Sequence, residues 1–259
     1  MNSQLSQTLL GPADPPPVRI VNPRGPSPFL LVGDHAGNAV PAALGSLGLT
    51  EMDLTRHIAW DIGIAGLGER LAAALDSVFV FQPYSRLVID CNRDPDALDA
   101  IPAQSDGTKV PANYALSSDD RTERVKAIHA PYQAAIAAEL ARRDAASQNT
   151  ILVSLHSFTP ALGGMTRPWQ IGILYSGGDK RFALSTLWRL RAEGDLIVGD
   201  NQPYAMDAID HTVPLHAFDA ERPYVEIEIR QDLLATPKDQ AAWGAMLVGL
   251  LQTAAAGIN

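Results

Sequence analysis

The feature that most constrains the fold is a series of short apolar runs that alternate with helical stretches. The first run is FLLVG at residues 29–33, and ILVSL at 151–155 is a second. Runs without polar alternation are typical of strands buried on both faces, as in a parallel sheet. We expect further strands at residues 78–82, 87–90, 170–175, 196–198 and 224–230.

Helical stretches fill most of the intervals between these strands. Apolar residues recur at helical spacing between residues 53 and 75, and further helices are predicted at 119–143, 180–191 and 237–254. The alternation of strands and helices predicts an α/β protein with a mostly parallel sheet and helices on both faces.

One domain is expected over residues 29–259, because no linker or repeat divides the chain there. Residues 1–28 are rich in proline, which removes backbone donors, so an irregular N-terminal arm is predicted. The segment 95–118 is rich in Pro, Asp, Gly and Ser and predicts a long loop. Long loops in compact domains are often functional, and we expect this one to cover the site.

Composition excludes several classes of protein. There are 20 Lys and Arg against 29 Asp and Glu, and this acidic balance argues against a nucleic-acid-binding surface. The single cysteine, Cys91, excludes an intramolecular disulfide and a cysteine-rich zinc module. Neither a membrane-spanning run nor a secretory signal pattern is found, so we expect a cytoplasmic protein without membrane partners.

Polar side chains follow the apolar runs, at the edge of the sheet where open parallel sheets bind ligands. His35 follows the first run and His156 follows ILVSL. Two histidines at strand ends with a nearby carboxylate suit a catalytic zinc, which uses three protein ligands and an open position. For a single histidine, a hydrogen-bonded polar strand end is the commoner explanation.

His57 and Asp61 are four residues apart in the first predicted helix and would share one of its faces. One interpretation gives Asp61 to a metal, with His57 beside it. The other is a hydrogen bond within the helix, and the spacing alone favours it. The motif HExxH, which marks a helix-borne zinc site, is absent.

The segment SRLVIDCNR at residues 85–93 places charged groups around a short apolar run. Arginine binds a carboxylate through a planar fork, so Arg86, Asn92 and Arg93 suggest a site for an acidic substrate. A structural salt bridge from Asp90 to one of these arginines is an equal alternative.

The segment VEIEIR puts Glu226, Glu228 and Arg230 on one face of a predicted strand. A buried charge is costly unless it is paired or bound to a metal. If the strand is central, Glu228 is the natural general base, whereas an edge strand facing water would make it harmless. A serine nucleophile is not favoured, because no GxSxG motif is present.

Several of these segments, in this order, resemble the N-formylglutamate amidohydrolase (N-formylglutamate deformylase) family. The matching segments are DHAGN at 34–38, HIAWDIG at 57–63, SRLVIDCNR at 85–93, LHSF at 155–158, RPW at 167–169, DNQPY at 200–204 and EIRQDL at 228–233. Each is weak alone, but the ordered set is specific and covers nearly the whole chain after the arm.

The resemblance implies a three-layer α/β/α sandwich of the zinc-dependent exopeptidase type. It implies that His35 and His156 bind zinc or another divalent metal, that Glu228 is the catalytic base, and that Arg86, Asn92 and Arg93 bind substrate. We also expect Asn201 and Arg230 to contribute to substrate binding. Related exopeptidases have a glutamate three residues after the first histidine, where this chain has Asn38, so we assign the remaining ligand position to Asp61.

The expected activity is metal-dependent hydrolysis of N-formyl-L-glutamate, or of a similar N-acyl acidic amino acid, to the free amino acid and formate. The expected cleft is electropositive, and the protein is expected to act as a monomer or homodimer, with histidine degradation as the associated process. Two alternatives remain open: a zinc carboxypeptidase or amidase that acts on peptide or cell-wall fragments, and an inactive relative that only binds ligand.

Overall fold

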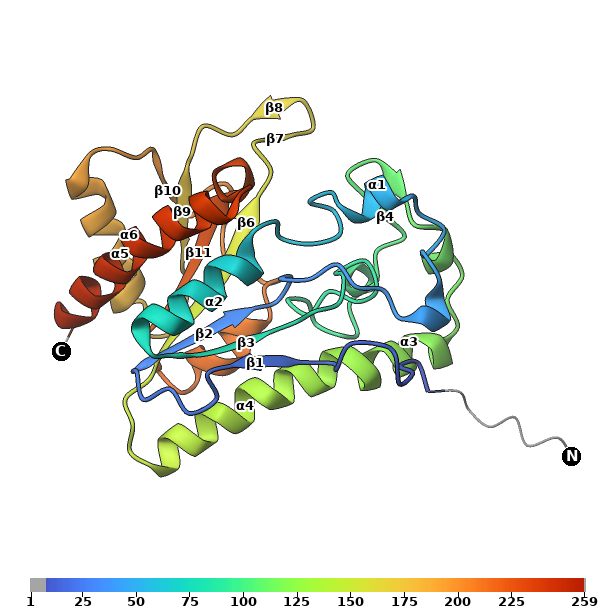
Figure 1. Cartoon of the computed structure of the whole chain (residues 1–259), viewed down its shortest axis with the longest axis horizontal. Coiled ribbons are helices and arrows are strands. Elements are labelled where there is room, and N and C mark those ends of the chain that lie inside the picture. The colour runs from blue at the N-terminus through green and yellow to red at the C-terminus, as the bar shows by residue number, and fades with distance from the viewer. Residues whose placement is uncertain (1–7, 259) are drawn as a thin grey trace, which may run out of the picture.

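The structure is a computed structural model that describes residues 8–258, and its centre is a seven-stranded sheet (Figure 1). The strand order is β1-β3-β2-β6-β11-β9-β10. In chain order the strands are β1 (Arg19–Val21), β2 (Phe29–Gly33), β3 (Val78–Phe81), β6 (Ile151–Phe158), β9 (Ile171–Leu174), β10 (Val198–Asp200) and β11 (Tyr224–Arg230). The four strands from β3 to β11 are parallel, whereas β1 and β9 run antiparallel to β3 and β11. The predicted mostly parallel sheet is confirmed.

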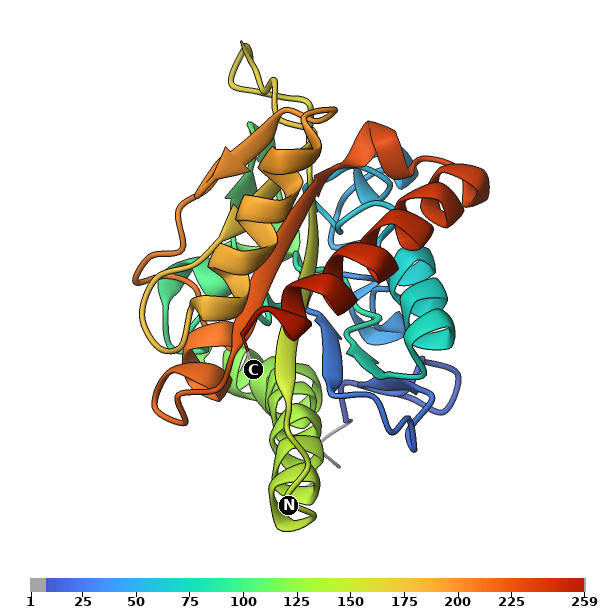
Figure 2. The ribbon, with the colours of Figure 1, turned by 90° about the vertical axis from the view of Figure 1, so that its left-hand side faces the viewer.

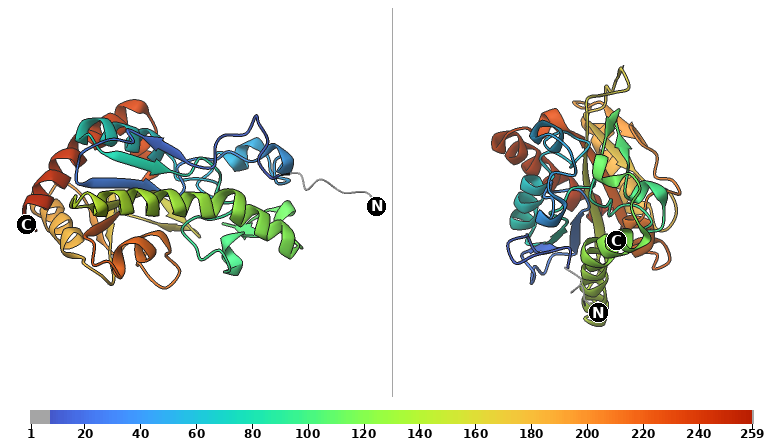
Figure 3. Two further views of the ribbon diagram at one scale, coloured as in Figure 1. Left: turned by 90° about the horizontal axis from the view of Figure 1, so that it is seen from below. Right: turned by 90° about the vertical axis from the view of Figure 1, so that its right-hand side faces the viewer.

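Helices cover both faces of this sheet (Figures 2 and 3). One face packs against α2 (Ile64–Leu75), α5 (Arg181–Glu193) and α6 (Pro237–Ala256), and the other packs against α4 (Ala130–Ala145). The predicted α/β/α sandwich is therefore confirmed.

The alternation of side chains along the central strands decides which face carries chemistry. In β11, Val225 and Ile227 join the apolar layer under α2, α5 and α6, and Tyr224 joins the layer under α4. Because side chains alternate with period two, Glu226 and Glu228 lie on the α4 side. β11 lies between β6 and β9, so it is a central strand, and water on an open sheet edge does not explain its carboxyls.

Three helix starts follow from local sequence. Thr50 is the N-cap of α1 (Glu51–Leu54), and Ser117 is the N-cap of α3 (Ser118–Arg124). Thr236 is the N-cap of α6. Each accepts a hydrogen bond from the backbone of the aspartate three residues later, which in turn reaches back to the capping residue.

The helix predicted over residues 53–75 is interrupted, which is a correction. Residues 55–63 form turns between α1 and α2. Their backbone groups are used elsewhere: the Asp61 amide donates to the carbonyl of His35 at 2.8 Å, and the carbonyl of Ala59 accepts from Ser85 and Arg86. Gly63, with φ +89°, then begins α2. His57 and Asp61 therefore do not share a helical face.

The strand predicted at residues 87–90 is also wrong. The segment is buried but forms turns, and the Val88 amide donates back to the carbonyl of Ser85. Side chains take the carbonyls that a neighbouring strand would need: Asn113 donates to Leu87, and Arg124 donates to Val88. The apolar run thus packs in the core without a strand partner.

The other predictions differ from the structure mainly at their ends. The helix predicted at 119–143 is α3 and α4 joined by a π-helical turn at Val125–His129. The arm contains β1, and its residues 1–7 lie outside the described part of the chain. Two small hairpins were not predicted; they pair β4 (Gln104–Ser105) with β5 (Thr108–Lys109) and β7 (Ala161–Leu162) with β8 (Met165–Thr166).

Among residues 8–258, no helix combines the length and the apolar character that crossing a bilayer requires.

Gly37, two residues after His35, is expected to be indispensable for this packing. A Cβ at this position would overlap the backbone of Pro83, whose carbonyl accepts from the amide of Ala39 at 3.1 Å. We expect Gly37→Ala to lower the free energy of unfolding by about 1–3 kcal/mol, as overpacking does. Urea denaturation followed by circular dichroism measures this change.

Gly249→Ala is the matched control, because nothing lies near a Cβ there and the residue is inside α6. It should leave stability unchanged or raise it by up to about 1 kcal/mol. Equal stabilities for the two variants would contradict the packing that we describe around His35.

Candidate metal centre

A cavity of about 580 Å³ lies at the carboxyl ends of the parallel strands. His35 lies two residues after the end of β2, and His156 and Glu228 come from the neighbouring strands β6 and β11. The predicted long loop contributes Asp99 and Asp106 to the same wall. The structure thus brings segments that are far apart in sequence into one site.

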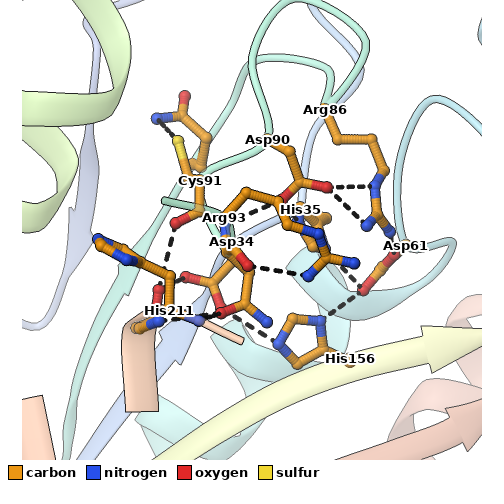
Figure 4. A network of polar contacts seen from close by, with 12 residues as sticks. Asp34, His35, Asp61, Arg86, Asp90, Cys91, Arg93, His156 and His211 are labelled. Atoms are coloured by element: carbon orange, nitrogen blue, oxygen red, sulfur yellow. Dashed lines mark hydrogen bonds and ion pairs between the residues drawn. The ribbon is translucent and has the colours of Figure 1, made fainter. Parts of the chain in front are cut away.

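His35, Asp61 and His156 form a compact, buried group at this cavity (Figure 4). One possible ligand atom from each residue lies within 4.8 Å of those from the other two. The Asp61 Oδ2 atom is 2.9 Å from His156 Nδ1 and 3.5 Å from His35 Nδ1. One carboxylate oxygen therefore faces the same nitrogen of both imidazole rings.

Two further aspartates hold the opposite nitrogens of these rings. His35 Nε2 is 2.7 Å from Asp90 Oδ1, and His156 Nε2 is 3.1 Å from Asp34 Oδ2. Ser154 Oγ also lies 3.0 Å from His156 Nε2. In metal sites, such carboxylates fix the orientation of a ligating histidine and leave its other nitrogen to the metal.

The residues present fit a divalent cation. His35 Nδ1 is buried and has no hydrogen-bond partner among the described residues, so a donor atom remains for a ligand. Two imidazole nitrogens and one carboxylate oxygen are a donor set that zinc accepts in catalytic sites. The glutamate position of related enzymes, Asn38, does not take part: its amide donates to the carbonyl of Leu54, while Asp61 supplies the carboxylate.

Electrostatic interactions among Asp61, His35 and His156 stabilise the charged forms of these side chains. Burial favours the neutral acid of Asp61, but the adjacent His35 and His156 outweigh burial and lower its pKa. Burial likewise opposes charge on His156, yet hydrogen bonds to Asp34 and Asp61 raise its pKa well above the usual value.

A chain of hydrogen bonds connects the centre to α4. Thr212 Oγ1 donates to Asp34 Oδ1 at 2.7 Å, and the Gln133 side chain donates to Thr212 at 3.0 Å. The Gln133 carbonyl oxygen lies 2.8 Å from His216 Nε2. The helix that covers this face of the sheet thereby supports the aspartate behind His156.

Arg86 and Arg93, two of the three arginines predicted to bind substrate, line the cavity, but both already face carboxylates of the protein. Arg86 donates twice to Asp90, at 3.1 and 2.7 Å. The guanidinium of Arg93 lies 3.2 Å from Asp99 and 3.9 Å from Asp210. The salt bridge from Asp90, which was the alternative interpretation of this segment, is present.

The other predicted substrate residues are placed differently. Asn92 lines the cavity, but its carbonyl oxygen accepts from the amides of His211 and Thr212, which gives it a structural role. Asn201 and Arg230 lie outside the cavity wall: Asn201 accepts from the Tyr175 amide, and Arg230 pairs with Asp232. His57 lines the wall, 3.3 Å from Asp106 and not beside Asp61.

Glu226 and Glu228 are buried in the same wall, and the Oε2 atoms of both lack partners among residues 8–258. Glu228 is the register partner of His156, and Glu226 that of Ser154. Burial raises the pKa of Glu228 to about 7 and that of Glu226 well above its ordinary value.

The cavity wall is acidic, which corrects the expected electropositive cleft for the protein without a cation. Two arginines, Arg86 and Arg93, and the imidazoles of His35 and His156 face a larger set of carboxyls, namely Asp61, Asp90, Asp99, Asp106, Asp207, Asp210, Glu226 and Glu228. The positive charge was expected from the arginines of the segment 85–93 alone. The aspartates that distant loops bring to these arginines could not be identified from the sequence.

Sequence reasoning missed three residues that support the centre. Asp34 had a visible signal, because it follows an apolar strand and precedes a histidine. Gln133 and Thr212 had no signal in the sequence, because each is an ordinary polar residue that reaches the site only through the tertiary fold.

Comparison with known structures supports this architecture. The gene product Atu2144 from Agrobacterium tumefaciens is 35% identical, with a TM-score of 0.92 over 96% of this chain and 99% of that one. An N-formylglutamate amidohydrolase from Ralstonia eutropha JMP134 is 18% identical, with a TM-score of 0.65 over 92% of this chain and 98% of that one. A search of curated proteins gave no match.

The α/β/α sandwich carries a buried His–Asp–His group at the carboxyl edge of its sheet, and the match to a family of amidohydrolases makes the protein a hydrolase that acts on amide bonds. The family model of N-formylglutamate amidohydrolase matches residues 27–235. The chain belongs to the N-formylglutamate amidohydrolase family.

Asp34 provides a test of the metal centre, because it contacts His156 without being one of the proposed ligands. We expect Asp34→Asn to weaken zinc binding about 10–100-fold, since the imidazole loses the carboxylate that orients it. Competition with a fluorescent zinc chelator measures the affinity.

Asp195→Asn serves as the control, because Asp195 is exposed and lies outside the cavity wall. It should bind zinc like the unmodified protein. Wild-type affinity in Asp34→Asn, with its fold intact by circular dichroism, would show that the Asp34–His156 contact does not serve metal binding.

Proposed function

We propose that the protein is a metal-dependent amidohydrolase that cleaves the amide bond of small N-acyl amino acids, with N-formyl compounds such as N-formyl-L-glutamate as the first candidates. The observation that carries the proposal is the buried His35–Asp61–His156 group with Glu228 beside it, whose Oε2 atom has no hydrogen-bond partner among residues 8–258. Family membership supports the same reaction class.

His35 Nδ1, His156 Nδ1 and Asp61 would hold a divalent metal, of which zinc suits the donors best. Such a metal, when bound, supplies Lewis-acid chemistry that polarises the acyl carbonyl and acidifies water. The remaining steps fall to side chains of the protein.

Glu228 would act as the general base and acid. The support for this role is that Glu228 is the register partner of His156 and lines the same cavity, and its Oε2, which has no partner among the described residues, could accept a proton from the attacking water. The same carboxyl would then deliver that proton to the amine that leaves. Asp61 is less suited to this role, because both imidazoles lie against it.

Arg86 would bind the α-carboxylate of the substrate. It lines the cavity, where its Nη2 donates to Asp90 at 2.7 Å and its Nη1 lies 3.5 Å from Asp61 Oδ1. The pair with Asp90 fixes the guanidinium plane, which reduces the entropy lost when a substrate binds. A cytoplasmic location, a role in histidine degradation and the acidic side chain of the substrate stay predictions from the sequence.

The direct test is an assay of the zinc-loaded protein with a panel of N-formyl-L-amino acids and a readout of released formate. We expect turnover that a chelator abolishes and zinc restores. Glu228→Gln should lower kcat about 10²–10⁴-fold, because general acid–base catalysis contributes that much.

Glu69→Gln is the matched control for this variant, because Glu69 is exposed on α2 and away from the cavity. It should keep wild-type turnover. A protein with stoichiometric metal that hydrolyses no N-acyl amino acid in the panel would refute the proposed function.

A further inference from the structure

Arg167 is a buried arginine that has no carboxylate partner in the described part of the chain. It is 8% exposed and directly follows the β7–β8 hairpin (Figure 1). Arg86 and Arg93 form ion pairs with aspartates, whereas none of the ion pairs among the described residues includes Arg167. Its Nη1 donates to the hydroxyl of Tyr204 at 2.8 Å and lies 3.5 Å from the carbonyl of Thr159, and its Nε and Nη2 atoms have no hydrogen bond to the described residues. A buried charge without a counter-charge is costly, so the burial of this guanidinium needs an explanation.

Tyr204 connects Arg167 to the cavity. Arg167 is not part of the cavity wall, but Tyr204 is, and the guanidinium lies 4.6 Å from the centre of the Tyr204 ring. The hydroxyl of Tyr204 accepts from Arg167, and none of the described residues accepts the proton of this hydroxyl. A hydrogen bond from a charged guanidinium polarises the phenol and makes its O–H a better donor. A ligand in the cavity can therefore accept a strong hydrogen bond from Tyr204.

The backbone that leads to Tyr204 passes beside the proposed base. Gly172 is the register partner of Glu228, and a Cβ at Gly172 would overlap the carbonyl oxygen of Gln202. Tyr204 follows only two residues later and lines the same cavity as Glu228.

Arg167 and Tyr204 lie one side-chain length beyond the metal centre. The guanidinium of Arg167 is 5.9 Å from the centre of the Phe158 ring, and Phe158 and Thr159 line the cavity. Phe158 is two residues after His156 on β6, which is roughly 6.6 Å along the strand. With the scissile amide at His156, the side chain of an amino acid can reach the hydroxyl of Tyr204.

We propose that Tyr204 is a specificity-determining residue whose hydroxyl binds the side-chain carboxylate of the substrate, and that Arg167 is a positioning residue that orients this hydroxyl and supplies the positive charge. This inference rests on the proposed function and names its substrate class: N-acyl derivatives of acidic amino acids, with N-formyl-L-glutamate as the first candidate.

The charges around the cavity favour this place for the second carboxylate of such a substrate. Arg93 is engaged by Asp99, and Arg86 is proposed to bind the α-carboxylate. Arg167 has no counter-charge among the described residues, and a carboxylate on Tyr204 would supply it. Stacking on the Tyr204 ring stabilises the guanidinium but does not neutralise it. A neutral side chain would gain a hydrogen bond from Tyr204 without this attraction between charges.

The test compares kcat/KM for N-formyl-L-glutamate and for its neutral isostere N-formyl-L-glutamine in the zinc-loaded protein. We expect the wild type to prefer glutamate at least about tenfold, because a hydrogen bond to a charged group is stronger than one to a neutral group. Tyr204→Phe and Arg167→Met should each reduce this preference below about threefold through a higher KM for N-formyl-L-glutamate, as the loss of a binding contact does.

Two further variants separate this role from a merely structural one. Arg167→Lys keeps the charge but not the planar fork, so its glutamate preference should exceed that of Arg167→Met at least about threefold. Tyr114→Phe is the matched control for Tyr204→Phe, because Tyr114 is 49% exposed and lies outside the cavity wall. It should keep the wild-type ratio of the two substrates.

A second measurement does not depend on turnover. Free L-glutamate should raise the melting temperature of the zinc-loaded wild type more than L-glutamine does, because only glutamate brings a second carboxylate to Tyr204. Tyr204→Phe, which removes a single oxygen atom, should abolish that difference.

The outcomes separate this inference from the proposed function. A wild type that does not prefer glutamate, a preference that survives Tyr204→Phe, or an equal loss with both substrates overturns the role of Tyr204 and leaves the proposed function standing. Absence of hydrolysis with every N-acyl amino acid, together with stabilisation by glutamate that needs Tyr204, refutes the proposed function and supports the carboxylate subsite.

Discussion

The structure depends on one carboxylate held between two buried imidazoles. Asp61 lies against both His35 and His156, and a separate aspartate restrains the far side of each ring. These charges stabilise one another only because all of them are in place, since an unpaired charge at this depth would be costly. The backbone serves the same purpose: residues 55–63 leave the helix, and the Asp61 amide instead binds the carbonyl of His35.

Much of the framework could be predicted from sequence, because it rests on local patterns. The apolar runs that form β2 and β6 are buried on both faces of the sheet. Their continuous apolar composition indicates this burial. The strand predicted at 87–90 failed for a physical reason: its composition suits the core equally well as a packed turn, once Asn113 and Arg124 take its carbonyls. Similarly, helical spacing at 53–75 could not reveal that loops compete for the backbone of Ala59 and Asp61.

The candidate site shows the same division. The two histidines and Glu228 could be identified because each sits in or directly after an apolar strand, and the assignment of Asp61 to the metal group agrees with the geometry even though the helix behind that assignment is absent. The charge of the cleft could not be predicted, since it depends on aspartates from loops that are distant in sequence. Among the described residues, the Oε2 atoms of Glu226 and Glu228 lack hydrogen-bond partners, and such buried groups lower stability for the sake of function.

A crystal structure of the zinc-loaded protein, with the metal located by anomalous scattering, tests the central claim most directly. The account predicts one zinc ion bound by Nδ1 of His35, Nδ1 of His156 and the carboxylate of Asp61, at about 2.0–2.2 Å, with Asp34 and Asp90 still on the opposite nitrogens. Zinc bound through the Nε2 atoms, or held at a place without Asp61, would contradict it.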